Sequence, residues 1–368
     1  EAMGTRILKL NIGNPAPFRF EAPDEMIRDM IYNLRDTEGY SSSKGLFSAR
    51  KAIMQYCQLK NIPNVDIDDI YTGNGVSELI AMAMQGLLNT GDEILVPSPD
   101  YPLWTASITL AGGTAVHYHC DEQAEWYPDI EDIKSKVTSR TKGIVVINPN
   151  NPTGALYPRE VLQDIVDVAR ENELIIFADE IYDRLMYDGE TISIASIPEM
   201  RDRTLVLDGF SKTYAMTGWR IGYCVANVDI IKKFEMIMVN SVSCTCSFTQ
   251  MAAVEALKGP QDSVVEMKNK FKERRDWLVN ALNEIDGIKC CMPRGAFYAF
   301  PDISSFGLSS KAFADRLLEE EGIALAWGTS FGEYGEGHIR ISYATSLENL
   351  KEAVERLKRF TLKLKNEK

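Results

Sequence analysis

Charged residues follow two short apolar runs of this sequence at the points where the runs end. Asp179 follows residues 174–178, and Lys212 follows residues 204–207. A buried carboxylate is costly unless it has a partner, and an acceptor-only group there suits a protonated ring nitrogen. Taken singly, an aspartate in this place is as often a helix cap, and a lysine is usually a solvated surface charge. The surface-charge explanation is less convincing for Lys212, because Arg220 follows eight residues later, between two glycines and ahead of another apolar run.

Two further runs end in turn-forming segments. Residues 70–72 lead into Gly-Asn-Gly-Val-Ser-Glu at 73–78, where small residues let the backbone approach a ligand and the first N–H groups of a helix can hold a phosphate. An ordinary glycine-rich turn is the commoner explanation of that pattern alone. Residues 143–147 lead into Asn-Pro-Asn-Asn-Pro-Thr-Gly at 148–154, which is rigid turn-forming backbone with a candidate cis bond before Pro152.

The elements that must position these residues alternate between apolar runs and helical patterns. This alternation predicts an α/β fold with a largely parallel, seven-stranded sheet, and ligands of such sheets bind beyond the carboxyl ends of the strands. The expected strands are 70–72, 93–96, 115–119, 143–147, 174–178, 204–207 and 221–225, with helices that include 77–88 and 158–171.

After about residue 226 the pattern becomes α+β, which predicts a second, smaller domain. We expect a large domain at 34–245 and a discontinuous small domain at 1–33 and 246–368. A mostly helical region to 283 precedes expected strands at 287–291, 296–300 and 337–343 and expected helices at 310–321 and 347–364. Because the sequence begins with Glu1 rather than Met, we also expect that a short segment precedes it.

Composition excludes several classes of partner. Forty Lys and Arg against 53 Asp and Glu give a net charge of −13, which argues against nucleic-acid and anionic-membrane binding. Seven cysteines without a CxxC pair indicate reduced thiols in a cytoplasmic protein. His117 and His119 alternate on one expected strand without a third ligand, so we expect no metal site.

The order and spacing of these motifs resemble the class I and II aminotransferases, which have pyridoxal-phosphate fold type I and bind pyridoxal 5′-phosphate. The resemblance covers nearly the whole chain and rests on residues 148–154, Asp-Glu-Ile-Tyr at 179–182, Ser-Lys at 211–212 and Gly-Trp-Arg-Ile-Gly at 218–222. The opening residues 10–18, Gly-Tyr-Ser at 39–41 and Asp-Tyr-Pro-Leu-Trp at 100–104 resemble the alanine (glutamate–pyruvate) aminotransferase branch.

The resemblance implies a role for each matching residue. Lys212 is the catalytic lysine, which bonds to the cofactor and, when free, moves a proton as general acid and base. Asp179 pairs with the ring nitrogen, and Arg340 and Gly13 bind the substrate carboxylate. The remaining implied cofactor contacts are the N–H groups of Val76 and Ser77, with Tyr101 stacked on the ring, Asn151 and Tyr182 on the ring oxygen, Ser211 and Arg220 on the phosphate, and Tyr40 on the phosphate of a neighbouring subunit.

The implied reaction moves an amino group between an α-amino acid and a 2-oxo acid through a pyridoxamine phosphate intermediate, in a homodimer with shared sites. Alanine and 2-oxoglutarate are the expected pair. Aspartate or aromatic aminotransferase activity, or a pyridoxal-phosphate C–S lyase on the same scaffold, are the alternatives. No residue is an obvious partner for a second substrate carboxylate, although Arg19 and Arg35 are candidates. The sequence departs from the family where Gly209 replaces a phosphate-binding serine and where Trp327 places a bulky ring near the expected substrate entrance.

Overall fold

The computed structural model describes residues 6–16 and 20–367, and its larger part is built on an eight-stranded sheet. The strand order is β2-β9-β8-β7-β6-β3-β4-β5. The strands are β2 (Ile70–Gly73), β3 (Glu93–Ser98), β4 (Thr114–Asp121), β5 (Tyr127–Pro128), β6 (Thr141–Ile147), β7 (Ile175–Asp179), β8 (Thr204–Gly209) and β9 (Gly222–Val225). All seven expected strands are present, and the eighth, β5, is a two-residue antiparallel addition at the edge. The predicted α/β fold class is therefore confirmed.

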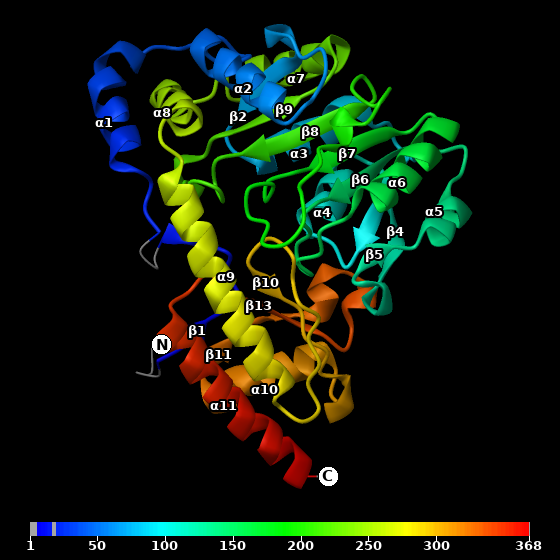
Figure 1. The fold of residues 1–368 in the computed structure, drawn as a ribbon. Coiled ribbons are helices and arrows are strands. Elements are labelled where there is room, and N and C mark those ends of the chain that lie inside the picture. The colour runs from blue at the N-terminus through cyan, green and yellow to red at the C-terminus, as the bar shows by residue number, and fades with distance from the viewer. Residues whose placement is uncertain (1–5, 17–19, 368) are drawn as a thin grey trace.

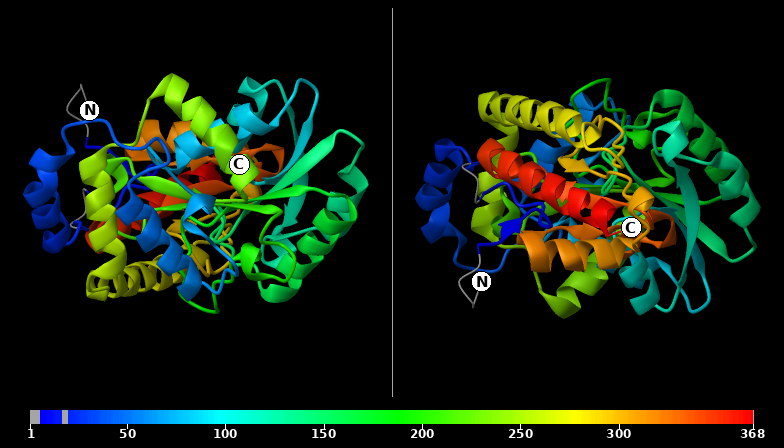
Figure 2. Two further views of the ribbon diagram at one scale, coloured as in Figure 1. Left: turned by 90° about the horizontal axis from the view of Figure 1, so that it is seen from above. Right: turned by 90° about the horizontal axis from the view of Figure 1, so that it is seen from below.

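Helices cover both faces of the sheet, because successive strand residues point to opposite faces. From β6, Val145 and Ile147 pack in the apolar cluster that also contains residues of α3, α4 and α7. Ile144 and Val146 pack in the cluster on the other face, with residues of α5 and α6. These helices are α3 (Val76–Leu87), α4 (Leu103–Leu110), α5 (Ile130–Lys136), α6 (Arg159–Glu171) and α7 (Val228–Ser241). Figure 2 shows the strands passing between the two helical layers.

The smaller part lies below the sheet in Figure 1 and has its own core. It contains β1 (Leu8–Lys9) paired with β11 (Ile323–Ala324), and the three-stranded sheet of β10 (Tyr298–Ala299), β13 (Ile339–Ser342) and β12 (Ala326–Trp327). Its helices are α9 (Asp262–Asn283), α10 (Ser310–Glu321) and α11 (Leu347–Asn366). The aromatic rings of Phe271, Phe297 and Tyr343 are fully buried between these elements.

One strand expected in this region is absent. The segment 287–291 makes only an isolated bridge, between Lys289 and Asp302. The side chain of Asn283 accepts a hydrogen bond from the Cys290 N–H (2.8 Å) and donates one to the Cys290 carbonyl (3.0 Å). A side chain therefore satisfies the backbone groups that a neighbouring strand would otherwise pair.

Helices α1 (Asp24–Asn33) and α8 (Ser247–Lys258) contact each other, and α8 also contacts α2 (Phe47–Leu59). Met26 of α1 and Ala253 of α8 share a buried cluster with Val206 of the large sheet. By packing, these two helices join the large part, although the boundaries expected from the sequence assign both to the small domain. The boundaries at 33/34 and 245/246 stay a prediction. Among the described residues, no helix has the length and apolarity required to cross a bilayer.

The topology brings several strand ends to one edge. From β3 the chain runs outward through β4 and β5, and it then returns to β6 and continues through β7 to β8 in the other direction. This reversal lies between β3 and β6, and ligands of open α/β sheets bind in the crevice that such a reversal opens. β2 also ends at this edge, because it is antiparallel to β9 and β9 is antiparallel to β8.

A buried cluster of charges lies at the ends of β7 and β8. The Nζ atom of Lys60, at the end of α2, is 2.6 Å from Glu180, 2.9 Å from Asp183 and 3.2 Å from Asp208. Burial, together with the charge of Asp183, raises the pKa of the Asp208 carboxyl to about 8. Lys60 therefore holds together the segments that lead from β7 and β8 towards the cavity described below, and it supplies the positive charge among three carboxylates.

Replacement of Lys60 by methionine should destabilise the fold, because three buried carboxylates lose their counter-charge. We expect a loss of about 3–5 kcal/mol in the free energy of unfolding, measured by denaturant titration. The folded state can bind protons on the unpaired carboxylates at low pH, so the loss should be smaller at pH 6 than at pH 8. Lys51→Met, at an exposed position of the same helix, is the control. Equal stability of the two variants at pH 8 would contradict this account.

Candidate active site

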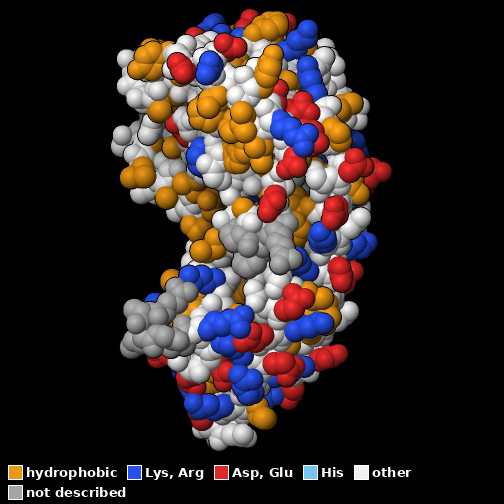
Figure 3. Space-filling model, turned by 90° about the vertical axis from the view of Figure 1, so that its left-hand side faces the viewer, with side chains coloured by type: hydrophobic (Ala, Val, Ile, Leu, Met, Phe, Trp, Pro, Cys, Tyr) orange, Lys and Arg blue, Asp and Glu red, His pale blue; other side chains and the backbone are white. Residues whose placement is uncertain are grey.

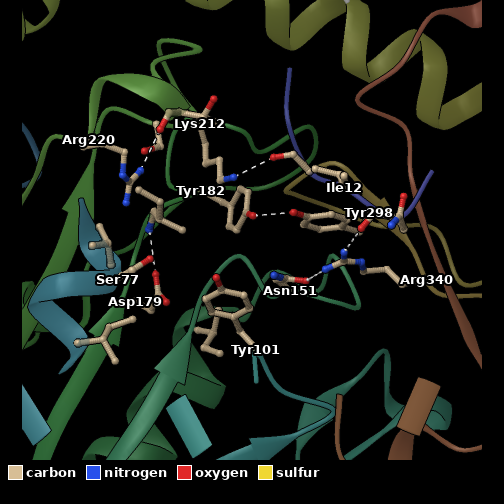
Figure 4. A pocket seen from close by; sticks show the side chains of 18 residues that line it. Ile12, Ser77, Tyr101, Asn151, Asp179, Tyr182, Lys212, Arg220, Tyr298 and Arg340 are labelled. Atoms are coloured by element: carbon tan, nitrogen blue, oxygen red, sulfur yellow. Dashed lines mark hydrogen bonds between the residues drawn. The ribbon is translucent and has the colours of Figure 1, made fainter. Parts of the chain in front are cut away.

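A cavity of about 390 Å³ lies at the carboxyl edge of the large sheet, where the small domain and the segment 11–13 meet it. All of the residues predicted to form the site, except Tyr40, line this cavity: Gly13, Val76, Ser77, Tyr101, Asn151, Asp179, Tyr182, Ser211, Lys212, Arg220 and Arg340. Figure 4 shows their side chains converging from the sheet, the small domain and the N-terminal segment. The structure therefore places together residues that lie as far apart in the chain as 13 and 340.

Lys212 follows β8 and reaches into the cavity. Its Nζ donates a hydrogen bond to the Gly13 carbonyl (2.9 Å) and lies 5.7 Å from the centre of the Phe297 ring. Burial lowers the pKa of this amine, and the charges of Arg340 and Arg220 lower it further. A larger fraction of the amine is therefore neutral, and the neutral form is the one that attacks a carbonyl group or accepts a proton.

Asp179 ends β7 and is buried. The indole Nε1 of Trp104 donates a hydrogen bond to its Oδ2 atom (3.2 Å), and the Ile181 N–H donates to Oδ1 (3.4 Å). Burial raises the pKa of this carboxyl to about 6. A cation next to Asp179 would lower that pKa again, so the site suits a protonated ring nitrogen.

A helix N-terminus of the kind that can bind an anion lies where β2 leads into α3. No side chain caps the N-terminus of α3, whose first N–H groups belong to Val76 and Ser77. Gly75 has φ +87°, and a Cβ atom there would overlap the Arg220 guanidinium. Arg220 itself donates to the carbonyls of Thr217 (2.9 Å) and Asn74 (3.2 Å), which holds it beside the helix start.

The glycine that departs from the family pattern has a packing reason. Gly209 pairs with Gly222 of β9, and a Cβ atom at 209 would lie 3.0 Å from the Gly222 Cα and 3.2 Å from the Ile221 carbonyl. Any larger residue at 209 must displace this backbone. Ser211 lines the cavity close by and is a candidate for the missing hydroxyl.

Arg340 is held in a fixed orientation at the small-domain side of the cavity. Its guanidinium donates to the Asn151 Oδ1 (2.8 Å) and to the Asn11 carbonyl (2.7 Å). The guanidinium carbon lies 4.3 Å from the Tyr298 ring centre and 4.7 Å from that of Phe331. Two rings and two acceptors thus orient a planar donor that matches a carboxylate.

Sequence reasoning missed several residues of this site. Tyr298 lines the cavity, and its hydroxyl is 2.9 Å from the Tyr182 hydroxyl. In the sequence, Trp104 belongs only to the motif of one family branch, and this motif does not predict its hydrogen bond to Asp179. Asn11 and Thr217 also line the cavity. The available signal was weak, because Tyr298 lies on a two-residue strand of the other domain.

Four residues that the sequence suggested for the surroundings of the site, Tyr40, Trp327, Arg19 and Arg35, are not among the described residues that line the cavity. Tyr40 is 91% exposed and does not reach the cavity of its own chain. Trp327, which was expected to place a bulky ring near the substrate entrance, is absent from the cavity lining, and the Lys311 amine lies 5.4 Å from the centre of its ring. Of the candidates for a second substrate carboxylate, Arg19 lies outside the described residues and Arg35 does not line the cavity.

The geometry fits pyridoxal 5′-phosphate. A lysine with a lowered pKa and a buried carboxylate that forms no ion pair with any described residue line one cavity, together with an uncapped helix N-terminus and an arginine. These groups match, in turn, an aldehyde, a protonated ring nitrogen and a phosphate. Tyr182 and Asn151 line the space between them and can donate to a ring oxygen.

Comparisons with known proteins agree with this geometry. The family model for aminotransferase class I and II matches residues 5–357. The chain is 48% identical to the glutamate–pyruvate aminotransferase AlaA of Haemophilus influenzae, over 98% of this chain and 92% of that protein. The structure is similar to the alanine aminotransferase of Pyrococcus furiosus (TM-score 0.95, 38% identity, 98% and 94% of the chains). It is also similar to the aspartate aminotransferase of Thermus thermophilus with maleate (TM-score 0.92, 34% identity, 97% and 92%).

The pH dependence of cofactor binding tests whether Asp179 pairs with the ring nitrogen of the cofactor. Its carboxyl must be ionised to pair with a protonated ring nitrogen, and burial raises its pKa to about 6. As the pH falls below 6, the affinity of the apoprotein for pyridoxal 5′-phosphate should therefore fall by roughly tenfold per pH unit relative to Asp179→Asn. Both proteins retain Lys212, so its titration cancels in this difference, which is measured by fluorescence titration. Parallel affinity curves for the two proteins would contradict the assignment.

Proposed function

The chain belongs to the class I and II aminotransferases, a pyridoxal-phosphate-dependent family, and from this premise we propose that it transfers an amino group between alanine and 2-oxoglutarate. The names of its relatives support alanine and glutamate as the amino donors. The single structural observation behind the proposal is the charge of the cavity. Its cationic lining residues, among those described, are Lys212, Arg220 and Arg340.

We assign two of these cations to the cofactor and one to the substrate. Lys212 bonds to the cofactor and Arg220 binds its phosphate, which leaves Arg340 for the substrate α-carboxylate. Alanine has no second carboxylate and needs no further cation. Aspartate would bring a second carboxylate into the cavity, whose described lining offers it no dedicated cationic partner, and this favours alanine over aspartate. The second carboxylate of 2-oxoglutarate meets the same lining, so the proposal of 2-oxoglutarate rests on the names of the relatives.

In the proposed reaction each residue has a physical task. The cofactor, when bound, stabilises negative charge that develops at the substrate Cα. Arg340 and the backbone at Gly13 orient the substrate, and this orientation determines which bond at Cα breaks. Lys212, once free, would take the proton from the substrate Cα as a neutral amine and, as an ammonium group, would deliver it to carbon C4′ of the cofactor. Asp179 stays ionised beside the ring nitrogen, and Tyr182 and Asn151 donate to the ring oxygen.

Single-turnover reactions of the holoenzyme with individual amino acids test the substrate. We expect alanine and glutamate to change the absorbance of the bound cofactor at least about tenfold faster than aspartate or phenylalanine do, a ratio that corresponds to about 1.4 kcal/mol in the barrier. Aspartate as fast as alanine would overturn the assignment. Release of ammonia and 2-oxo acid without an added acceptor would instead identify a lyase.

We further propose a homodimer with shared active sites. Exposed apolar side chains gather on α1, on the segment that follows it and at the start of α2: Ile27, Ile31, Tyr32, Leu34, Tyr40 and Phe47. Figure 3 shows apolar side chains concentrated on the large-domain half of this face. A contiguous patch of this kind marks a protein interface, and a second copy would bring its Tyr40 to the phosphate site.

The seven free cysteines support a reducing, cytoplasmic location. Recovery of the active protein from an extracellular fraction would contradict this location.

Light scattering after gel filtration tests the dimer. The native protein should have about twice the mass of its 41.3 kDa chain. The double variant Ile31→Glu, Tyr32→Glu should shift towards the monomer and lose cofactor affinity, because charges in an apolar interface are costly. Leu362→Glu, at an exposed apolar position on α11, is the control and should remain dimeric. A native protein that is monomeric at micromolar concentration with full cofactor affinity would exclude shared sites.

A further inference from the structure

Tyr298 is the one aromatic side chain of the small-domain sheet that lines the cavity among the described residues. It lies on β10, is 2% exposed, and points towards Tyr182 in Figure 4. Its hydroxyl is 2.9 Å from the Tyr182 hydroxyl, and the two rings meet edge to face with centroids 5.9 Å apart. The family motifs that predicted the site do not include this residue, and the reaction described above does not use it.

The surroundings of Tyr298 hold it in this position. The guanidinium carbon of Arg340 lies 4.3 Å from the centre of the Tyr298 ring. The Phe297 ring packs beside the Tyr298 ring, with their centroids 4.9 Å apart. Gly13 approaches the hydroxyl so closely that a Cβ atom at this position would overlap the Tyr298 oxygen. The same Gly13 carbonyl accepts the hydrogen bond from Lys212. The Tyr298 hydroxyl is thus confined on several sides and is directed at Tyr182.

One hydrogen bond between two hydroxyls leaves two possible donors, and chemistry selects between them. The ring oxygen of the cofactor is negatively charged and can only accept hydrogen bonds. A charged acceptor forms a stronger hydrogen bond than a neutral hydroxyl does, so the proton of Tyr182 points to the ring oxygen when the cofactor is bound. The proton in the contact between the tyrosines must then come from Tyr298.

On the basis of the proposed function, we infer that Tyr298 is a positioning residue that donates a hydrogen bond to Tyr182 and thereby strengthens the bond from Tyr182 to the cofactor's ring oxygen. Hydrogen bonds in a chain polarise one another, which makes Tyr182 a better donor. Tyr182 belongs to the large domain and Tyr298 to the small domain. The support that the ring oxygen receives therefore depends on the position of the small domain.

The placement of Arg340 on the same ring extends this link. The substrate α-carboxylate binds Arg340 in the proposed reaction, and Arg340 contacts both Tyr298 and Asn151. Carboxylate binding therefore reaches the ring oxygen by two routes, one through Asn151 directly and one through Tyr298 and Tyr182. The second route consists of the ring contact between Arg340 and Tyr298, the hydrogen bond from Tyr298 to Tyr182 and the proposed hydrogen bond from Tyr182 to the ring oxygen, and it is broken when the Tyr298 hydroxyl is removed.

A spectroscopic titration of the holoenzyme tests the inference without measuring turnover. The nitrogen that joins Lys212 to the bound cofactor can be protonated or deprotonated, and the two forms absorb at different wavelengths. The deprotonated form depends more on hydrogen-bond donors to the ring oxygen. Tyr298→Phe should therefore raise the midpoint of this absorbance titration by about half a pH unit, which corresponds to the partial loss of one hydrogen bond. Tyr343→Phe is the matched control, because it removes a buried hydroxyl of the same domain that does not line the cavity. Its midpoint should stay at the wild-type value.

A double-mutant cycle separates a role through Tyr182 from a general structural effect. In a Tyr182→Phe background, Tyr298→Phe should produce no further shift, because the residue through which it acts is gone. Equal additional shifts in both backgrounds, or an unchanged midpoint in the single variant, would overturn the inference. An unfolding temperature of Tyr298→Phe close to that of the Tyr343→Phe control shows that the comparison concerns folded proteins. Failure of the wild-type protein to bind pyridoxal 5′-phosphate would instead contradict the proposed function itself.

Discussion

Burial of the Lys212 amine away from water is the physical constraint on which the proposed chemistry of the cavity depends. An ammonium ion buried in a protein loses its hydration, and this loss lowers the pKa of Lys212. The two arginines that face the same cavity act in the same direction. Burial raises the pKa of Asp179, which lines the same cavity, and the ring nitrogen of the proposed cofactor is the cation that would keep this carboxyl ionised. One cavity can therefore hold a neutral amine and a carboxylate, although burial opposes the charge of both.

The sheet supports this arrangement from behind. β7 and β8 are neighbours, so Asp179 and Lys212 leave the same edge of the sheet, and Lys60 ties together the acidic residues that lie next to both strand ends. The small domain closes the other side with Arg340 and Tyr298, and the segment 11–13 covers Lys212 through a backbone carbonyl. The polar groups that surround the cavity thus come from three parts of the chain, each fixed by its own packing or hydrogen bonds.

Much of the large domain could be predicted from the sequence, because its strands are continuous apolar runs and several of its functional residues lie within a few positions of the ends of those runs. Asp179 and Lys212 illustrate this, because Asp179 is the last residue of β7 and Lys212 follows the end of β8 closely. The rest depends on contacts between distant residues. Tyr298 meets Tyr182 across 116 positions of sequence, and Trp104 meets Asp179 across 75. The segment 287–291 has the composition of a strand, but Asn283 satisfies its backbone instead, and no local pattern reveals that choice.

The central claim is that Lys212 is the amine that bonds to the cofactor. The holoenzyme should be reduced with borohydride and digested, and the peptides should be sequenced by mass spectrometry. Reduction makes the bond between lysine and cofactor permanent, so the account predicts a single modified peptide with the mass of the cofactor on Lys212. A modification on another lysine, or no modification in a protein that has bound the cofactor, would contradict it.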